Sequence, residues 1–341
     1  TNNAIKDQLE KGIIFSLPTL LEQQMAELIC EVVPCAEQVR FAKNGTDVDL
    51  AAVRIARSFT KREHIAKCGY HGWGDWHGVT LRPYGIPSVL KDYVHSFEYN
   101  NLDSLEEVLK KHKVAGIIME VQALTAPAPG FLEGVRDLAD KYGALLIFDE
   151  VVTGFGRTGR MWGSESVGFS SDHATMGKGI TSGYFPLSAI AIGESLQERM
   201  KEKSRRLNSF AHAATYAAHP VGAAAALKTL EIMEREKLLE HAATIGGLLE
   251  KELRPLGEHP LIGDVRFHGL AAALDFRIRD ENDELSTEDP IGLCNRINSE
   301  LIEDGLITRP VNGSLLIAPP LITTSDQILE ISEKKIGRAH V

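Results

Sequence analysis

The sequence predicts an α/β fold in which a mainly parallel, doubly wound sheet is followed by a smaller α+β domain. Strand-like and helix-like segments alternate along the first part of the chain, as in the succession Val114–Met119, Leu132–Tyr142 and Ala144–Phe148. Such alternation is typical of parallel sheets whose helices cover both faces. Past Pro220 a helical stretch gives way to short strands, which predicts the second domain.

The elements of the first domain follow from hydrophobic periodicity. Apolar residues recur with helical spacing in Glu22–Val32 and in Asp47–Ser58, and the short strand-like segment Gln38–Lys43 lies between them. Val114–Met119 and Ala144–Phe148 are continuous apolar runs, which is the pattern of strands buried on both faces. We therefore expect both runs to form buried strands.

A change in amino-acid composition marks the approach to the second domain. An Ala-rich stretch with many Glu and Lys residues runs from Pro220 towards Leu253 and predicts one long connecting helix. We accordingly place a large domain at residues 1–245 and a C-terminal α+β domain at residues 246–334. Three short strands and one polar loop are expected after the helix: Gly263–Phe267, Leu270–Phe276, Leu315–Ala318 and Arg279–Pro290.

The sequence predicts that the chain is truncated at both ends. The chain starts at Thr1 without Met and without a signal-peptide pattern. Its end, Lys335–Val341, resembles the translation of a common sequencing adapter, and the alternative is a genuine short tail. We expect a truncated fold, with a segment missing before Thr1 and a non-native tail at residues 335–341.

Composition limits the classes of function. Hydrophobic residues make up 43% of the chain and charged residues 25%, which is ordinary for a soluble globular protein. A net charge of −10 without a basic patch argues against a nucleic-acid partner. No apolar run is long enough to cross a membrane. The four cysteines show no C-x-x-C spacing and favour a reducing, cytoplasmic location.

An acid and a lysine each follow an apolar run. Asp149 ends the strand at Ala144–Phe148, and Lys178 follows His173–Met176 after one glycine, 29 residues further on. This separation suits neighbouring parallel strands, whose carboxyl ends converge on one crevice. Pyridoxal phosphate needs such a pair, an amine for a Schiff base and an anion for its pyridinium nitrogen. The alternative is an aspartate that caps a helix and a solvated surface lysine.

Two further segments have chemical potential. Asn44–Asp47 lies between a strand and a helix, where free N–H groups bind a phosphate, although an ordinary helix cap explains it equally. His71, Asp75 and His77 share one aromatic loop and are metal-ligand types. Because no further ligands stand at readable spacing, we expect no metal there.

Several motifs occur together in a characteristic order and spacing: Asn44–Asp47, Gly69–Gly72, Glu120, Asp149–Arg157, Gly177–Gly179, Thr215–Pro220 and Ala318–Leu321. In this combination the chain resembles the class III pyridoxal-phosphate aminotransferases of fold type I over nearly its full length. The Tyr70–Trp73 loop is most similar to the glutamate-1-semialdehyde-aminomutase-like branch. Phe155–Gly159, Thr181–Tyr184 and Val265–Arg266 are more similar to the ω-amino acid:pyruvate transaminases.

The resemblance implies roles around the cofactor ring. Lys178 would hold the cofactor as an aldimine and then move the proton between substrate and cofactor. Asp149 would pair with the pyridinium nitrogen, with His71 close to it. Tyr70 would stack on one face of the ring, and Val151 would pack on the other.

The resemblance also implies how the phosphate is held. The backbone of Gly45 and Thr46 would bind it, and Thr215 matches a residue that reaches the phosphate from the partner subunit. This implies a homodimer with shared sites. Glu120 matches a glutamate near the cofactor, although Val121 replaces the usual proline there.

The substrate is less constrained by these matches. Leu316 and Thr125 stand where ornithine- and 4-aminobutyrate-type members carry a carboxylate-binding arginine and its glutamate partner, so such substrates are not expected. Arg309 matches the mobile arginine with which ω-transaminases bind a carboxylate. The alternative for Arg309 is a surface arginine on a strand.

The prediction for function is a pyridoxal-phosphate-dependent aminotransferase. It would move an amino group from an amine or amino acid to a keto acid by ping-pong kinetics. The alternatives are a glutamate-1-semialdehyde-type 2,1-aminomutase, which moves the amine within one molecule, and a catalytically incomplete fragment of the fold.

Overall fold

The computed structural model describes residues 1–122, 125–166, 168–194, 196, 212–276, 278–279, 285–286 and 290–334. The predicted tail at residues 335–341 lies outside this part of the chain. The described residues form two compact units. The larger unit contains Thr1–Val121, Pro127–Phe155 and Met161–Arg235, and the smaller contains Gln122–Ala126, Gly156–Arg160 and the described part of Glu236–Val341.

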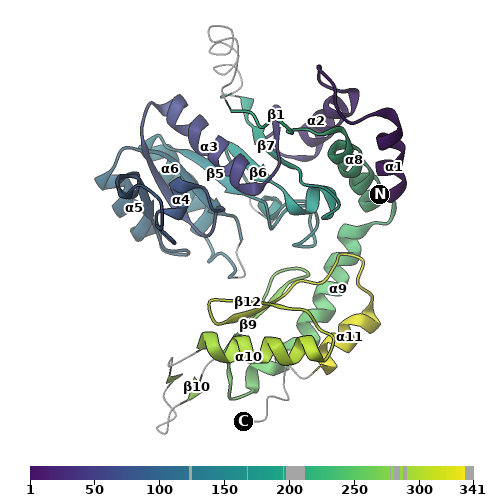
Figure 1. The fold of residues 1–341 in the computed structure, drawn as a ribbon. Helices are drawn as coiled ribbons and strands as arrows, with labels where there is room; N and C mark the ends of the chain where they lie inside the picture. Colours follow the sequence, from purple (N-terminus) through teal and green to yellow (C-terminus); the bar gives the residue numbers. More distant parts are fainter. Residues whose placement is uncertain are drawn as a thin grey trace. The chain divides into compact units, whose positions relative to one another are not determined.

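A seven-stranded sheet forms the centre of the larger unit (Figure 1). Its strands are β1 (Gln38–Ala42), β2 (His64–Cys68), β3 (Val94–Ser96), β4 (Val114–Glu120), β5 (Leu145–Asp149), β6 (His173–Met176) and β7 (Ser188–Ile192). They lie in the order β1-β7-β6-β5-β4-β2-β3. All neighbouring pairs from β6 to β3 are parallel, and only β7 runs antiparallel to its two neighbours. The predicted mainly parallel sheet is confirmed.

Helices cover both faces of this sheet. The three that pack on its centre are α3 (Gly45–Thr60), α5 (Leu102–Lys111) and α6 (Phe131–Tyr142). In β5, Leu145 and Ile147 belong to the hydrophobic cluster with α3, whereas Leu146 and Phe148 belong to the cluster with α5 and α6. Since successive side chains of a strand point to opposite faces, one apolar run buries itself in two cores. This arrangement confirms the doubly wound prediction.

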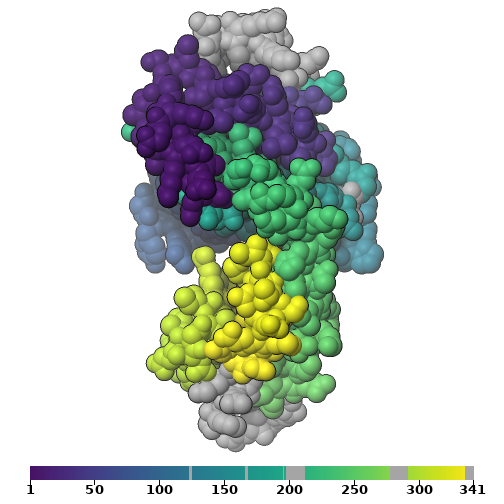
Figure 2. Space-filling model, turned by 90° about the vertical axis from the view of Figure 1, so that its right-hand side faces the viewer, coloured from purple at the N-terminus to yellow at the C-terminus, as the bar shows by residue number. Residues whose placement is uncertain are grey.

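Among the described residues of the larger unit, α1 (Asn2–Lys11) and α2 (Leu20–Val32) lie near the start of its sequence and α8 (Pro220–Arg235) lies at its end. The short segments between them are the single turn α4 (Asp75–Gly78) and the 3-10 segments η1 (Ser88–Tyr93), η2 (Gly163–Ser166) and η3 (Lys178–Thr181). Both α1 and α2 contact α8, and Figure 2 shows the purple N-terminal residues beside this green helix. The N-terminal segment therefore belongs to the body of the larger unit.

Two connections of the chain shape the fold. The residues described between β5 and β6 form turns and the short η2 segment, and they contain no α-helix. The prediction of one long connecting helix is wrong, because this stretch forms two helices, α8 and α9 (Leu238–Leu253). Lys237 separates them with a φ of 50°, in the left-handed region that ends an α-helix. The domain boundary predicted after residue 245 falls within α9.

The smaller unit is an antiparallel sheet with helices. Its four-stranded sheet has the order β12-β13-β9-β8, and its elements are η4 (Arg254–Glu258), β8 (Ile262–Phe267), β9 (Ala272–Phe276), α10 (Pro290–Glu303), β12 (Arg309–Val311), β13 (Ser314–Ile317) and α11 (Ser325–Glu333). The described residues of the predicted polar loop contribute to a short hairpin of β10 (Ile278–Arg279) and β11 (Leu285–Ser286). A buried apolar cluster joins α9, α10 and this sheet. The predicted small α+β domain is confirmed as a fold.

None of the helices in the described ranges combines the length and the apolar composition that a membrane-spanning helix requires.

Candidate functional site

Four parallel strands of the larger sheet carry polar residues at their carboxyl ends. β4 ends at Glu120 and β5 at Asp149, and the two residues are paired in register. His71 lies in the loop after β2, and Lys178 follows β6 after one glycine. Burial and the charge of Asp149 raise the pKa of Glu120, and the charges of His71 and Lys178 oppose that rise, so these side chains act on one another. The structure thus brings four predicted site residues to the same edge of the sheet.

His71 and Asp149 form a buried pair. The Nδ1 atom of His71 lies 2.8 Å from Oδ2 of Asp149, and the two side chains are 0% and 4% exposed. The other ring nitrogen, Nε2, lies 2.9 Å from the carbonyl oxygen of Cys68 and must donate to it, because a carbonyl only accepts. Oδ1 of Asp149 accepts from the backbone N–H of Val151 at 3.0 Å. The Asp149 carboxylate is therefore fixed in position from two sides.

The loop that carries His71 is held by its own aromatic residues. Trp76 stacks on the His71 ring at 6.2 Å with an interplanar angle of 13°. The Nε2 atom of His77 accepts from the backbone N–H of His71 at 3.2 Å. Burial, with the charges of Lys67 and His71, lowers the pKa of His77 to about 3, which keeps this nitrogen an acceptor. The Nε2 atom of His77 thus serves to position the loop.

Asp49 is a site residue that the sequence analysis missed. Its carboxyl group is buried, and Oδ1 accepts from the Thr175 hydroxyl at 2.7 Å, next to the Asp149–Thr175 strand pair. Burial, and secondly the charge of Asp149, raise the pKa of Asp49 well above its usual range. An acid on the apolar face of a helix was the available signal, because Ala52, Val53 and Ala56 share that face.

Glu120 lies beside the loop after β2. A methyl group on Gly69 would lie 3.2 Å from its Oε2 atom, so the carboxyl group packs closely against the loop. Burial, and secondly the charge of Asp149, raise the pKa of Glu120 to about 7. This side chain is therefore poised to change its charge near neutral pH.

We expect Glu120 to make stability depend on pH in the cofactor-free protein. Because its folded pKa is raised from 4.5 to about 7, the native state holds the proton more tightly, and the free energy of unfolding falls as pH rises through this interval. Glu120→Gln should remove about 2–3 kcal/mol of that fall. Denaturant unfolding of both proteins at pH 5 and pH 8 measures it. Glu107→Gln, at an exposed carboxylate, serves as the control, and equal pH dependence in all three proteins would contradict the assignment.

The N-terminus of α3 faces the same region. The first N–H groups of a helix lack intrahelical partners and favour an anion. The methyl groups of Val151 lie 3.1 Å and 3.2 Å from the place where a Cβ on Gly45 would stand. The same side chain lies 3.6 Å from the corresponding place on Gly177, directly before Lys178. Val151 thus joins the predicted phosphate loop to the predicted catalytic lysine.

Gly72 is the point where the aromatic loop meets α3. Its φ is +86°, and a Cβ there would lie 2.4 Å from the Cβ of Thr46 and 2.9 Å from its Cα. Thr46 also accepts a hydrogen bond from the backbone N–H of Gly74 through its hydroxyl at 3.1 Å. The loop with Tyr70 and His71 is therefore fixed against the first turn of α3.

We expect Gly72→Ala to destabilise the protein by about 2–4 kcal/mol, because overpacking adds to backbone strain. The displaced loop should also weaken cofactor binding. Gly85→Ala is the matched control, since Gly85 has a φ of +77° but nothing within 4 Å of its missing Cβ. In that variant the free energy of unfolding should fall only by the cost of backbone strain, about 1–2 kcal/mol. Denaturant unfolding compares the two, and equal losses would show that the contact with Thr46 does not matter.

Lys178 stands in an unusual backbone conformation. Its φ is 35°, and it begins η3 between two glycines. A Cβ on Gly179 would lie 2.7 Å from the Cβ of Phe155, so only glycine allows the chain to pass here without a shift. The side chain of Lys178 is exposed. The local structure therefore presents the amine on a constrained turn rather than in the interior.

Three other predicted site residues, Tyr70, Thr215 and Arg309, are also exposed. Tyr70 is 61% exposed, with its ring edge-on to that of His77 at 5.4 Å. Thr215 is also exposed, in the turn before α8. Arg309 is exposed in β12 and lies directly across from Leu316 in β13. Arg309 and Leu316, the two positions considered above for a substrate-binding arginine, are thus cross-strand neighbours.

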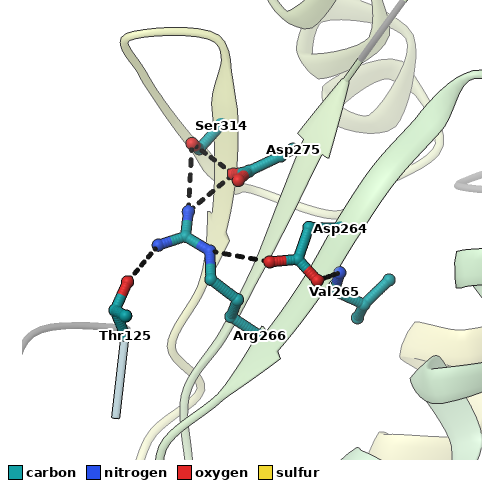
Figure 3. A network of polar contacts seen from close by, with 6 residues as sticks. All are labelled: Thr125, Asp264, Val265, Arg266, Asp275 and Ser314. Atoms are coloured by element: carbon teal, nitrogen blue, oxygen red, sulfur yellow. Dashed lines mark hydrogen bonds and ion pairs between the residues drawn. The ribbon is translucent and has the colours of Figure 1, made fainter. Parts of the chain in front are cut away.

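Arg266 organises a polar network in the smaller unit (Figure 3). Its guanidinium group donates to Asp275 at 2.6 Å and to the hydroxyl of Thr125 at 3.1 Å, and it lies 3.8 Å from a carboxylate oxygen of Asp264. Ser314 donates to the same Asp275 oxygen at 2.6 Å. Thr125, which the sequence analysis considered only for specificity, thus ties its segment to β8.

The chain is similar to a known protein family over most of its length. The sequence pattern of the family Aminotransferase class-III matches residues 1–336. The chain is 35% identical over 269 residues to the 3-aminobutyryl-CoA aminotransferase of Cloacimonas acidaminovorans, covering 75% of this chain and 62% of that protein. It is 36% identical over 255 residues to the glutamate-1-semialdehyde 2,1-aminomutase of Syntrophobacter fumaroxidans, covering 70% and 58%. The chain thus spans only 62% and 58% of the length of these two relatives.

The fold has a similarly clear counterpart among solved structures. The ω-transaminase of Pseudomonas jessenii in complex with PMP superimposes with a TM-score of 0.89 at 26% identity, over 97% of this chain and 82% of that chain. With the family pattern matched from residue 1 to residue 336, the conclusion is plain: the chain belongs to the class III aminotransferases.

Proposed function

We propose that this chain is the catalytic body of a pyridoxal-phosphate-dependent aminotransferase. It would move an amino group from an amine or amino acid to a keto acid by ping-pong kinetics. The observation that carries the proposal is the convergence of the Lys178 amine and the buried His71–Asp149 pair at one edge of the sheet. Lys178 stands on a constrained turn, and hydrogen bonds from two sides fix the Asp149 carboxylate in position.

The residues at this edge fit pyridoxal phosphate. The N-terminus of α3 suits the phosphate, the Asp149 carboxylate suits the pyridinium nitrogen, and Lys178 suits the aldehyde. The exposed Tyr70 ring and the Val151 methyl groups offer two apolar surfaces for the ring. When bound, the cofactor supplies an aldehyde that takes up amines and a ring that withdraws electrons.

Each residue of the site would have its own role in the reaction. The Nζ atom of Lys178 holds the cofactor and afterwards carries the proton to and from the substrate carbon. Asp149, oriented by His71 and the Val151 N–H, holds the negative charge that keeps the ring nitrogen protonated. The backbone of Gly45 and Thr46 binds the phosphate, and Glu120 borders the cofactor. Because Glu120 titrates near pH 7, its charge would tune the site around neutrality.

Assembly and location belong to the same proposal. Thr215, exposed before α8, would reach the phosphate of a second subunit, which makes the functional form a homodimer with shared sites. Arg309 would bind the substrate carboxylate as an exposed guanidinium fork on β12. The four cysteines are free thiols, which supports a cytoplasmic location.

A second candidate is a 2,1-aminomutase. The Tyr-His-Gly-Trp loop and the 36% identity to a glutamate-1-semialdehyde 2,1-aminomutase favour it. The two reactions use the same cofactor residues, and they differ in whether an external keto acid accepts the amine. A third candidate, an incomplete fragment of the fold, would lack a functional cofactor site.

One experiment separates the three candidates. The cofactor-loaded protein is mixed with a primary amine donor in a single turnover, and the absorbance of the bound cofactor is followed. A transaminase converts the cofactor to its aminated form, and added pyruvate then restores the original spectrum. An aminomutase instead converts glutamate-1-semialdehyde fully without any keto acid. A protein that retains no cofactor after gel filtration would support the incomplete fragment.

A further inference from the structure

Three histidines lie together in the larger unit, away from the cofactor residues. His64 is the first residue of β2, His95 lies in the edge strand β3, and His112 follows α5 directly. The cofactor loop begins after Cys68, at the other end of β2. Because a strand rises about 3.3 Å per residue, His64 and Cys68 are separated by about 13 Å along the strand. The histidines therefore belong to a different place on the fold.

The three imidazole rings are in mutual contact. The Nδ1 atom of His64 lies 3.0 Å from Nε2 of His95. The ring centroid of His112 lies 4.9 Å from that of His64 and 3.7 Å from that of His95. One ring nitrogen from each histidine can be chosen so that all three lie within 4.8 Å of one another. All three side chains are partly exposed, so the cluster is accessible from solvent.

Strand pairing brings the backbone of these residues together. His64 pairs with Val114, two residues after His112, and Ile65 pairs with Val94, the residue before His95. The register of β2 and β4 shifts between His64 and Ile65, and the extra residue, Ala115, lies on β4. Val114 then donates its backbone N–H to the carbonyl of His112 at 3.0 Å, which fixes the turn between α5 and β4.

Each of the three rings offers one nitrogen to a shared position. Imidazole is the commonest metal ligand among protein side chains, and it binds the ion in its neutral form.

We propose that His64, His95 and His112 bind one divalent transition metal ion, with Zn²⁺ as the favoured ion and water as the fourth ligand. Three imidazoles suit Zn²⁺, Ni²⁺ or Cu²⁺ and not Mg²⁺ or Ca²⁺, which prefer oxygen ligands. Zn²⁺ bonds imidazole nitrogen at about 2.0–2.1 Å, which places two nitrogens of a tetrahedral site about 3.3 Å apart. The 3.0 Å pair already has nearly this spacing. The ligand nitrogen of His112 lies within 4.8 Å of the other two, so this ring must move closer to them when the ion binds.

The position of the site determines its effect. The ion would connect the edge strand β3, the start of β2 and the turn after α5. These segments are otherwise joined by the parallel pairing of β2 with β3 and by packing. A ligand that binds only the native state stabilises it by mass action. The ion should therefore protect this end of the sheet against unfolding, and it should leave the chemistry at the opposite end unchanged.

The test uses the untagged, cofactor-loaded protein after treatment with a chelator and dialysis. Equilibrium dialysis with ZnCl₂ should give one Zn²⁺ per chain, and Co²⁺ should produce the intense visible absorption of a tetrahedral site. His95→Gln and His112→Gln should each weaken Zn²⁺ binding at least about 10- to 100-fold, the loss known even for outer-shell partners. They should also abolish the rise in melting temperature that Zn²⁺ causes in the unmodified protein.

His259→Gln is the matched control, because it removes a partly exposed histidine from the smaller unit. It should bind Zn²⁺ like the unmodified chain. Circular dichroism checks that each glutamine variant folds. Absence of stoichiometric Zn²⁺ binding would overturn the proposal, and so would binding that survives unchanged in both cluster variants. In either case the three rings would form only a packing cluster, and the proposed aminotransferase function would stand untouched.

Discussion

Lys178→Ala is expected to abolish turnover, with a loss of at least about 10²–10⁴-fold in kcat. The substitution removes the amine that holds the cofactor and the group that moves the proton. Because the Lys178 side chain is exposed, its removal takes away no buried packing, and the fold should persist. Transfer of an amino group to pyruvate measures kcat, and the absorbance of the bound cofactor should change in the same variant.

The control for this experiment is a lysine of similar exposure elsewhere. Lys251→Ala changes an exposed residue of α9 in the smaller unit and should leave turnover unchanged. A small primary amine added to the Lys178→Ala protein should restore part of the proton transfer, because it can occupy the space of the missing side chain. Full activity in the Lys178→Ala protein would show that turnover does not need this lysine, and it would refute the catalytic role proposed for Lys178.

Asp149→Asn should lower kcat/KM by at least about 10²-fold, the size of loss typical for a preorganised electrostatic group. The amide keeps the shape of the side chain but cannot supply the negative charge for the ring nitrogen. Asp49→Asn should change kcat/KM far less. Burial, and secondly the charge of Asp149, raise the pKa of Asp49 well above its usual range, which favours the neutral form that an amide resembles. Steady-state kinetics of the two variants give the comparison.

The comparison of Asp149→Asn with Asp49→Asn is informative because the two acids are close neighbours with similar burial. A general effect of disturbing the site would lower activity equally in both variants. Thermal unfolding provides a second measurement, since Asp49→Asn retains an oxygen that accepts from Thr175. If Asp49→Asn proved as damaging as Asp149→Asn, the assignment of the charged role to Asp149 alone would be wrong.

The amino-acid sequence determined the elements of the fold and the chemical types at the site. Continuous apolar runs predicted β4 and β5 because a strand buried on both faces leaves no room for polar residues. The acid and the lysine after β5 and β6 could be predicted to share one edge, since neighbouring parallel strands end on the same side. The glycines that flank Lys178 were visible in the sequence, and the structure shows that Gly179 has no room for a Cβ beside Phe155. These features depend on local periodicity and on the geometry of a single chain segment.

Contacts between distant segments could not be predicted in this way. The His71–Asp149 pair joins residues 78 positions apart, and its distance depends on the exact course of two loops. Asp49 became a site residue only because α3 packs its apolar face on the sheet beside Asp149. Arg309 and Leu316 proved to be cross-strand neighbours only once the register of β12 and β13 was known.

The break between α8 and α9 shows the same limit, because nothing in an Ala-rich helical pattern marks Lys237 as the residue that adopts a left-handed conformation. The three-histidine cluster is a further case, since His64 begins β2, His95 lies in β3 and His112 follows α5, and their rings meet only in the folded structure. The sequence by itself thus specified strands, helices and the residues for an amine and its counter-charge. Their pairing, protonation and neighbours were decided by tertiary packing, because the energy of a buried charge depends on every group within a few ångströms and not on spacing along the chain.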